Sequence, residues 1–216
     1  MSEVINKFFI VIDFGTTNIS IGAYLDQKCI IIKNTNNEMT ISPSIIFEDN
    51  NFFIINKNEL NKKLENYESI IYDIKRLIGL KYDELSQKEF FKNLSFEIFD
   101  IDNIPKIKII KNGKDLLKTI EEICSSIFKE IIKLTENYLA KLGKAIKITK
   151  AYIILPKFFS NRQKKSIEFA AILAGIDDPK IVDESFPEMI GYALNQDLFY
   201  KKEDNTVIID GIKKTH

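Results

Sequence analysis

The chain has 216 residues, of which 45% are hydrophobic and 29% are charged, as in an ordinary soluble globular protein with a substantial core. Its 31 basic and 31 acidic side chains cancel, so no overall field favours nucleic acid or an anionic membrane surface. We therefore expect neither a nucleic-acid partner nor a membrane partner.

The few cysteines and histidines argue against a metal or thiol site. Cys29 and Cys124 are far apart in apolar stretches, and the one histidine is His216. We predict two buried free thiols, without a zinc site or a Cys-His nucleophile. The N-terminal residues lack a signal-peptide pattern, and no apolar run reaches about 18 residues. This pattern predicts a cytoplasmic protein.

Short apolar runs in the first quarter of the chain predict strands. The first run ends at Gly15 and is apolar apart from Asp13, which predicts a strand buried on both faces. The first three strands should form a meander, and Pro43 marks a break after it. The predicted strands cover residues 8–14, 19–25, 29–33, 45–47 and 52–55.

The middle of the chain changes character twice. Residues 57–93 are polar with scattered helical spacing. A second strand pair is predicted at residues 96–101 and 106–111, closed by the turn signal Asn112-Gly113. Residues 115–142 then predict the clearest helix, because apolar residues recur every three or four positions. These positions are Leu116, Ile120, Ile123, Ile127, Ile131, Leu134, Tyr138 and Leu142, with Gly143 as the stop.

Strands and helices alternate in the last third. Strands are predicted at residues 148–155, 180–182 and 207–210, and helices at residues 161–174 and 185–196. This alternation implies a parallel segment of sheet. The predicted fold is α/β: a mixed sheet with flanking helices formed by residues 1–38 and 115–216, carrying an inserted α+β subdomain at residues 39–114.

The turn after the first strand has the residues of a phosphate-binding turn. Gly15 lets a backbone approach phosphate closely, and the hydroxyls of Thr16 and Thr17 beside Asn18 add donors. Asp13, at the strand end, can hold Mg²⁺ through water. An ordinary hairpin turn would use the same residues. A P-loop of the form G-x-x-x-x-G-K-[ST] does not occur.

Five segments in order resemble the 70-kDa heat-shock chaperone (DnaK-type) family, a branch of the actin and hexokinase superfamily. Residues 11–18, VIDFGTTN, resemble its first phosphate motif, and residues 73–79, DIKRLIG, resemble its DAKRLIG segment. Residues 153–159 resemble its VTVPAYF strand, proline and aromatic pair, and residues 156–184 keep its spacing. Residues 185–194 resemble the helix after its NEP motif. The resemblance implies one lobe of an actin-like, ribonuclease H-like ATPase domain.

The resemblance also implies ATP or ADP with Mg²⁺ as cofactors and a role for each site residue. The turn from Gly15 to Asn18 would cradle phosphates, and Asp13 would position hydrated Mg²⁺. Lys75 would reach the γ-phosphate and the attacking water, and Glu184 would orient that water. Asp210 would be the second acidic partner and would also hold the metal through water. Such a set suffices because phosphoryl transfer depends mainly on positioning and charge neutralisation.

Two segments depart from the family pattern. Where the family has NEPT, this chain has Asp183-Glu184-Ser185-Phe186, which keeps the carboxylate and lacks the proline. Where the family continues DLGGGT, side chains of residues 212–214 replace glycines after Asp210. Pro156 corresponds to the proline that couples nucleotide state to the rest of the chaperone, although it also fits a simple strand end.

Two functions follow from these patterns. The first is an ATP-binding chaperone-family protein with a partial or divergent nucleotide site, whose hydrolysis needs a second lobe. The alternative is a non-catalytic, degenerate half-domain that acts as an interaction module. A sugar kinase or an actin relative is a third interpretation, which the DIKRLIG segment disfavours. Expected partners are nucleotide, other chaperone or cochaperone chains, and a second copy through the face that the absent lobe would cover.

Overall fold

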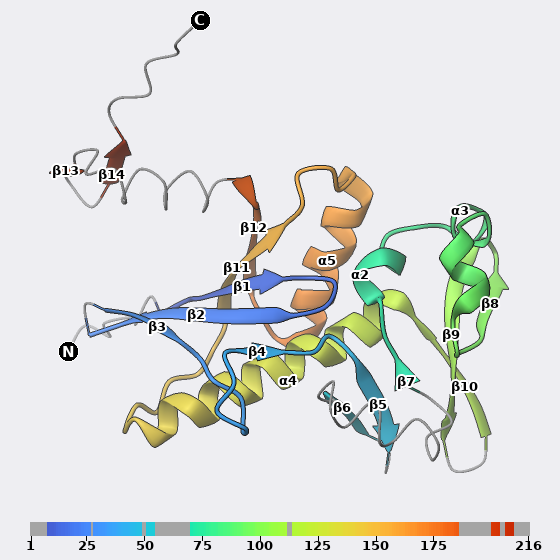
Figure 1. Ribbon diagram of the computed structural model, residues 1–216, viewed down its shortest axis with the longest axis horizontal. Coiled ribbons are helices and arrows are strands. Elements are labelled where there is room, and N and C mark those ends of the chain that lie inside the picture. The colour runs from blue at the N-terminus through green and yellow to red at the C-terminus, as the bar shows by residue number, and fades with distance from the viewer. Residues whose placement is uncertain are drawn as a thin grey trace, which may run out of the picture.

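A mixed sheet forms the centre of the molecule (Figure 1). The computed structural model describes residues 8–26, 28–48, 51–54, 70–111, 114–185, 200–203 and 206–209. The strands of this sheet are β1 (Ile10–Phe14), β2 (Ile19–Leu25), β3 (Lys28–Ile31), β4 (Thr40–Ile41), β11 (Lys150–Leu155) and β12 (Asp178–Asp183). Their order is β12-β11-β1-β2-β3, and β4 pairs with β2.

The pairing of these strands confirms the predicted meander and parallel segment. β1, β2 and β3 pair antiparallel, whereas β1 runs parallel to β11 and β11 runs parallel to β12. Ile10, Ile12 and Phe14 are fully buried, but Asp13 between them is exposed. The prediction of a first strand buried on both faces is therefore wrong, because alternate residues of a strand point to opposite faces.

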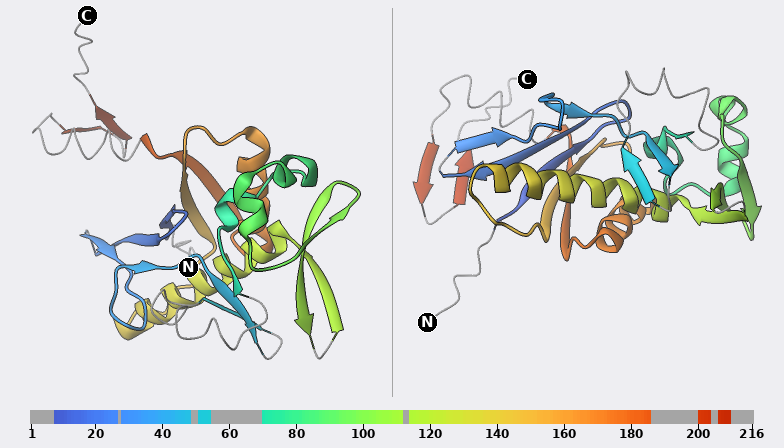
Figure 2. Two further views of the ribbon diagram at one scale, coloured as in Figure 1. Left: turned by 45° about the vertical axis from the view of Figure 1, so that its right-hand side comes forward. Right: turned by 90° about the horizontal axis from the view of Figure 1, so that it is seen from below.

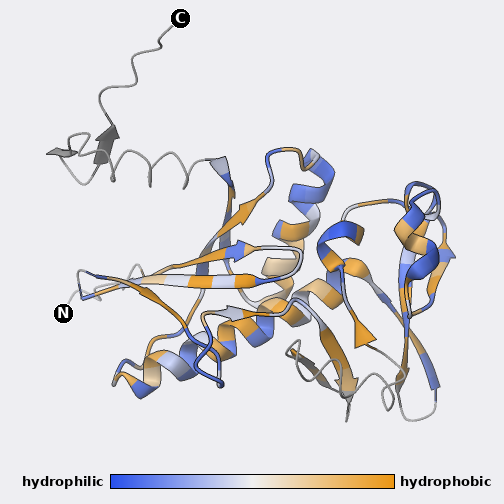
Figure 3. Cartoon of the chain, viewed as in Figure 1, coloured by the Kyte–Doolittle hydropathy of each residue, from blue (hydrophilic) through white to orange (hydrophobic). Residues whose placement is uncertain are grey.

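Two long helices pack against the sheet: α4 (Ile120–Lys141) and α5 (Asn161–Ala174). The Phe14 ring stacks on Phe128 of α4 with centroids 5.3 Å apart, which places α4 on the buried face of β1. The bounds predicted for α5 are confirmed. Its start is a capping box between Ser160 and Gln163, and Gly175 ends it with a φ of 102°. In Figure 3 the main strands are predominantly hydrophobic, whereas α4 alternates hydrophobic and hydrophilic residues.

The start predicted for the long helix is wrong by five residues. Residues 115–119 belong to a strand, β10 (Lys114–Thr119), which pairs antiparallel with β9 (Ile104–Lys111). The helix begins at Ile120, because the Thr119 side chain accepts a hydrogen bond from the Glu122 backbone N–H in a capping box. The apolar spacing continued across this boundary, so it could not show where the strand ended.

The segment between β4 and α4 forms two further three-stranded sheets (Figure 2). One has the order β6-β5-β7 and the other β10-β9-β8, with short helices between them. Besides β9 and β10, the elements of this segment are β5 (Ile45–Glu48), β6 (Asn51–Ile54), β7 (Ile70–Ile71), α2 (Ile74–Leu77), α3 (Tyr82–Ser86), the 3₁₀ helix η1 (Glu89–Asn93) and β8 (Ile98–Ile101).

The turn of the β8–β9 hairpin was also predicted wrongly. Asp102 and Asn103 form it, with φ values of 55° and 63° that suit short polar side chains. The turn signal at residues 112–113 instead falls between β9 and β10, and these two residues lie outside the described ranges.

The described C-terminal residues form a separate antiparallel pair, β13 (Tyr200–Glu203) and β14 (Thr206–Ile209). The strand predicted at residues 207–210 is confirmed as far as Ile209, and Asp210 lies outside the described residues. Of the helix predicted at residues 185–196, only Ser185 is described, and it is helical. Among the described helices, none combines the length and apolar character needed to cross a membrane.

Candidate functional site

The turn after β1 is tight and requires glycine. The Gly15 backbone N–H donates to the Asp13 carbonyl at 3.1 Å. A Cβ atom on Gly15 would lie 2.1 Å from the Asn18 carbonyl oxygen, so any larger residue would open the turn. Thr16, Thr17 and Asn18 are exposed beside the exposed Asp13 carboxylate. This end of the sheet therefore offers hydroxyl, amide and carboxylate groups to solvent.

Lys75 is buried, with 8% of its surface exposed. It lies on the short helix α2, and its Nζ atom is 5.7 Å from the centroid of the Phe159 ring. Burial lowers the pKa of Lys75, and the carboxylates of Asp13 and Glu184 act against this by raising it. Three predicted site residues from distant parts of the chain are thus brought together.

Glu184 follows β12 directly. Its backbone N–H donates to the Leu155 carbonyl at 2.9 Å, which continues the parallel pairing by one residue and fixes the place of Glu184 beside β11. The preceding Asp183 accepts a hydrogen bond from Lys164 Nζ at 2.7 Å. Glu184 itself is exposed, so its carboxylate is accessible to water.

A tight turn connects β11 to α5. Pro156 is buried at its start, and its carbonyl accepts a hydrogen bond from the Phe159 N–H at 3.1 Å. The motifs gave Phe159 no role of its own, although its ring lies below the Lys75 ammonium. Arg162 was likewise missed, although it is one of only two arginines in the chain.

The residues present fit a hydrated metal with a phosphate ligand better than a directly ligated metal. Among the described residues, no three His, Cys, Asp or Glu side chains converge in a group that could hold an ion. Asp13 and Glu184 supply accessible carboxylates for water-mediated contact, and Lys75 supplies a cation for phosphate. The roles assigned to all of these residues remain predictions: Asp13, Gly15, Thr16, Thr17, Asn18, Lys75, Glu184 and Asp210.

The two cysteines differ in environment. Cys124 on α4 is fully buried, and burial raises the pKa of its thiol well above the ordinary value. Cys29 on β3 is exposed, so the prediction that both thiols are buried is wrong for this residue. Its strand, β3, is an edge strand of the main sheet.

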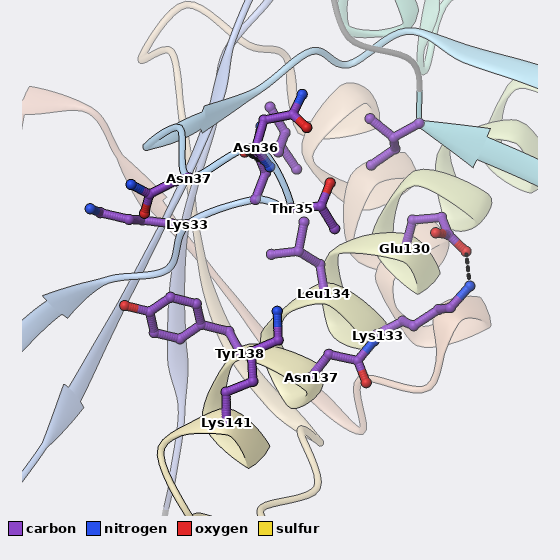
Figure 4. Close-up of a pocket in the computed structure, with 13 residues that line it drawn as sticks. Lys33, Thr35, Asn36, Asn37, Glu130, Lys133, Leu134, Asn137, Tyr138 and Lys141 are labelled. Atoms are coloured by element: carbon purple, nitrogen blue, oxygen red, sulfur yellow. Dashed lines mark hydrogen bonds and ion pairs between the residues drawn. The ribbon is translucent and has the colours of Figure 1, made fainter.

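A separate polar cavity of about 500 Å³ lies between the β3–β4 loop and α4 (Figure 4). Lys33, Lys133 and Lys141 line it together with asparagine side chains, and Lys133 pairs with Glu130 at 3.5 Å. None of the predicted site residues within the described ranges lines this cavity. It is therefore an independent feature and a useful control for the site around Lys75.

The comparisons with known proteins identify the family. The model of the Hsp70 protein family matches residues 9–211, which is most of the chain. The chain belongs to the Hsp70 family, and the resemblance seen in its motifs is confirmed.

Three similar proteins show the extent of the match. A heat shock protein of the SSB type from Pyricularia oryzae is 29% identical over 97% of this chain and 33% of its own length. A heat shock 70 kDa protein of Neurospora crassa is 26% identical over 92% of this chain and 30% of its own. A ribosome-associated molecular chaperone SSB of Candida glabrata is 28% identical over 90% of this chain and 30% of its own length. The chain thus spans about a third of the length of the curated relatives it matches.

Proposed function

We propose that this chain binds ATP or ADP with Mg²⁺ at the end of β1, as part of an Hsp70-type chaperone. The observation that carries the proposal is the buried side chain of Lys75, which lies close enough to Asp13 and Glu184 for their carboxylates to raise its pKa against the effect of burial. Burying a lysine without a strong partner costs free energy, and such groups occur more often at functional sites than elsewhere. A phosphate ligand would supply the missing negative charge.

In the proposed complex each group has one task. The turn from Gly15 to Asn18 presents backbone N–H groups and hydroxyls to phosphate oxygens, and Asp13 holds water of the hydrated metal. Lys75 neutralises charge on the terminal phosphate, and Glu184 orients a water molecule near it. Asp210, by the family pattern, is the second acidic group.

The finer fold assignment belongs to the same proposal. We infer an actin-like ATPase lobe formed by residues 1–38 and 115–216 with an inserted subdomain at residues 39–114. In support, β1 pairs antiparallel with β2 and parallel with β11 in one mixed sheet. The pairing of β10 with β9 supports an insertion that continues to Thr119.

ATP hydrolysis coupled to protein folding, with cochaperone partners, is the proposed activity of the whole protein. The support is family membership, and one relative is named as a ribosome-associated molecular chaperone. Hydrolysis would require the groups that face this lobe across the cleft, because the described residues supply one side of the phosphate site.

Calorimetric titration of the chain with Mg-ATP and Mg-ADP tests the binding proposal. We expect weak binding that Asp13→Asn reduces at least about tenfold, since a charge at the metal site is lost. Asp177→Asn removes the same charge from an exposed loop before β12 and should leave the affinity unchanged. A chain that gives no heat at millimolar Mg-ATP, or an Asp13→Asn variant with parental affinity, would contradict the proposal.

A second candidate is a non-catalytic interaction module, which one observation favours. Phe9 and Tyr152 pack edge to face with centroids 5.0 Å apart, yet remain 39% and 40% exposed on the sheet face opposite the core. Exposed aromatic residues are typical of protein contacts. Sedimentation that shows self-association lost in a Phe9→Ser, Tyr152→Ser double variant, without nucleotide binding, would support the module instead.

A further inference from the structure

The helix that carries Lys75 is too short to be stable without tertiary contacts. α2 has four residues, a single turn, and short helices are unstable unless tertiary contacts support them. Its N-cap residue, Asp73, has a left-handed φ of 57° and makes no side-chain cap hydrogen bond. The position of the Lys75 ammonium therefore depends on the contacts that hold the segment from Asp73 to Gly79.

One of these contacts is local and exposed. Arg76 pairs with Asp73 at 3.1 Å, and its guanidinium lies 4.0 Å from the centroid of the Phe90 ring. These three groups all belong to the segment between β4 and α4, so they cannot fix Lys75 relative to the main sheet. Packing does part of this, because α2 contacts α4 and the side chains of Ile74 and Leu77 are fully buried in the core. A directed hydrogen bond that does so must reach from the α2 segment to α4, to α5 or to the main sheet.

Arg162, in the first turn of α5, makes such a contact. Its Nε atom donates to the Gly79 carbonyl at 2.6 Å, and its guanidinium also pairs with the Glu84 carboxylate of α3. The planar guanidinium allows one side chain to bond both groups at once, which an ammonium on a flexible stem does less well. A bond across 83 residues thus ties the end of the α2 segment to the helix beside the main sheet.

The backbones at this contact are in direct apposition. Gly79 has a φ of 71°, and a Cβ atom there would lie 2.5 Å from the Gln163 Cα atom. Gln163 is itself fixed, because its N–H donates to the Ser160 hydroxyl in the capping box of α5. We call Gly79, Arg162 and Gln163 the α2–α5 clamp.

The clamp and the Lys75 contacts meet at the same turn. Phe159, whose ring lies below Lys75 Nζ, immediately precedes the Ser160 cap of α5. The start of α5 therefore touches the α2 segment at the lysine and again four residues later at Gly79. These two contacts, on either side of a single helical turn, add to the core packing of α2 in fixing its orientation relative to α5.

We propose that Arg162 is a positioning residue for Lys75, which holds the lysine ammonium beside Asp13 and Glu184 through the Gly79 carbonyl. The part of this inference that concerns ligand affinity rests on the proposed nucleotide function, whereas the part that concerns the lysine does not. The Glu84 pair is of lesser importance, because both side chains are more than 40% exposed and exposed ion pairs contribute little.

Lysine labelling without nucleotide tests the positioning itself. The rate of acylation of Lys75, followed by mass spectrometry as a function of pH, reports its burial and its pKa. In Arg162→Gln we expect an apparent pKa of Lys75 closer to its ordinary value, and faster labelling at pH values above that pKa, because the lysine is less well buried once the bond to the Gly79 carbonyl is lost. Glu84→Gln is the matched control, which keeps the Gly79 bond and should label like the parent.

A double-mutant cycle with Mg-ATP tests whether Arg162 acts through the lysine. We expect Arg162→Gln to weaken binding about tenfold in the parent and to have no further effect in Lys75→Met. An equal loss in both backgrounds, or parental labelling of Lys75 in Arg162→Gln, would overturn the inference. If Arg162→Gln loses its native circular dichroism, Arg162→Lys is measured in its place, with intermediate labelling and affinity expected.

The two proposals fail in distinguishable ways. If the parent chain does not bind Mg-ATP, the nucleotide function is wrong, and the labelling rates of Lys75 alone decide the role of Arg162. If the parent binds Mg-ATP and Lys75 is labelled at the same rate in Arg162→Gln and Glu84→Gln, the nucleotide function is supported and the positioning role of Arg162 is wrong.

Discussion

Two regions of this molecule place a lysine a few residues before a left-handed glycine, and they differ in packing. Lys75 precedes Gly79, which has a φ of 71°, and Lys141 precedes Gly143, which has a φ of 75°. The first pair is buried, with Gly79 against α5, whereas the second is exposed at the end of α4 beside the cavity of Figure 4. Because the residue types are the same, comparing the two pairs tests how burial changes the effect of a substitution on stability.

This difference distinguishes a lysine that indicates a functional site from lysines that are ordinary surface residues. In a chain with many lysines, a cavity lined by several of them is expected on the surface, where the charged ends stay hydrated. A lysine that is 8% exposed has lost most of that hydration, and the cost of burying its charge must be compensated by another interaction or by function. We attribute the compensation to the ligand proposed for Lys75, and the following predictions test the comparison.

The largest effect is expected at the glycines. Gly79→Ala must accommodate both an unfavourable φ and a Cβ atom 2.5 Å from the Gln163 Cα atom, so we expect a loss of about 3 kcal/mol in the free energy of unfolding. Gly143→Ala has a similar φ but no atom within 4 Å of the added Cβ, and should cost about 1 kcal/mol. Urea unfolding of both variants measures the difference.

Equal losses in the two glycine variants would show that φ alone decides the cost and that the α2–α5 clamp does not resist an added atom. A loss at Gly79 without a change in Lys75 labelling would separate fold stability from the position of the lysine.

The sequence predicted the elements whose ends have local chemical signals. The bounds of α5 follow from Ser160 at its cap and Gly175 at its end, and both are local features. The start of α4 was missed because apolar residues at helical spacing continue into β10, where Leu116 and Leu117 are only partly buried. Pairing with β9, a tertiary contact, makes residues 115–119 a strand.

The candidate site was predictable to the extent that family motifs name its residues. The motifs named Asp13, Lys75 and Glu184, and the structure brings these three together. Arg162 could not be found in this way, because its role depends on a contact with a carbonyl group 83 residues away. Its one sequence signal was the rarity of arginine in the chain.

A smaller effect of opposite sign is expected at the lysines. Lys75→Met removes a buried charge and keeps an unbranched side chain, so we expect about 1 kcal/mol of added stability without ligand and weaker binding of Mg-ATP. Lys141→Met changes an exposed residue and should alter stability by less than about 0.5 kcal/mol. Urea unfolding and titration calorimetry check both variants, and a destabilised Lys75→Met would mean that the ion contacts outweigh the cost of burial.

The smallest expected effect is the pH dependence of the stability that Lys75→Met adds. The folded-state pKa of Lys75 lies below its ordinary value of 10.5 because burial disfavours the charged form, so the unfolded chain binds more protons between the two values. In that window the parent gains stability with rising pH, whereas Lys75→Met does not. Asp13 and Glu184, the charged groups that face Lys75, act in the opposite sense by raising its pKa and narrow the window.

The stability difference between Lys75→Met and the parent should therefore be largest near neutral pH and should shrink toward about pH 10. All other residues are the same in both chains, so their contributions cancel in the difference. A Lys75→Met difference that grows with pH would mean that the folded state raises the pKa of Lys75, and the contrast between the two regions would then rest on packing of the glycines alone.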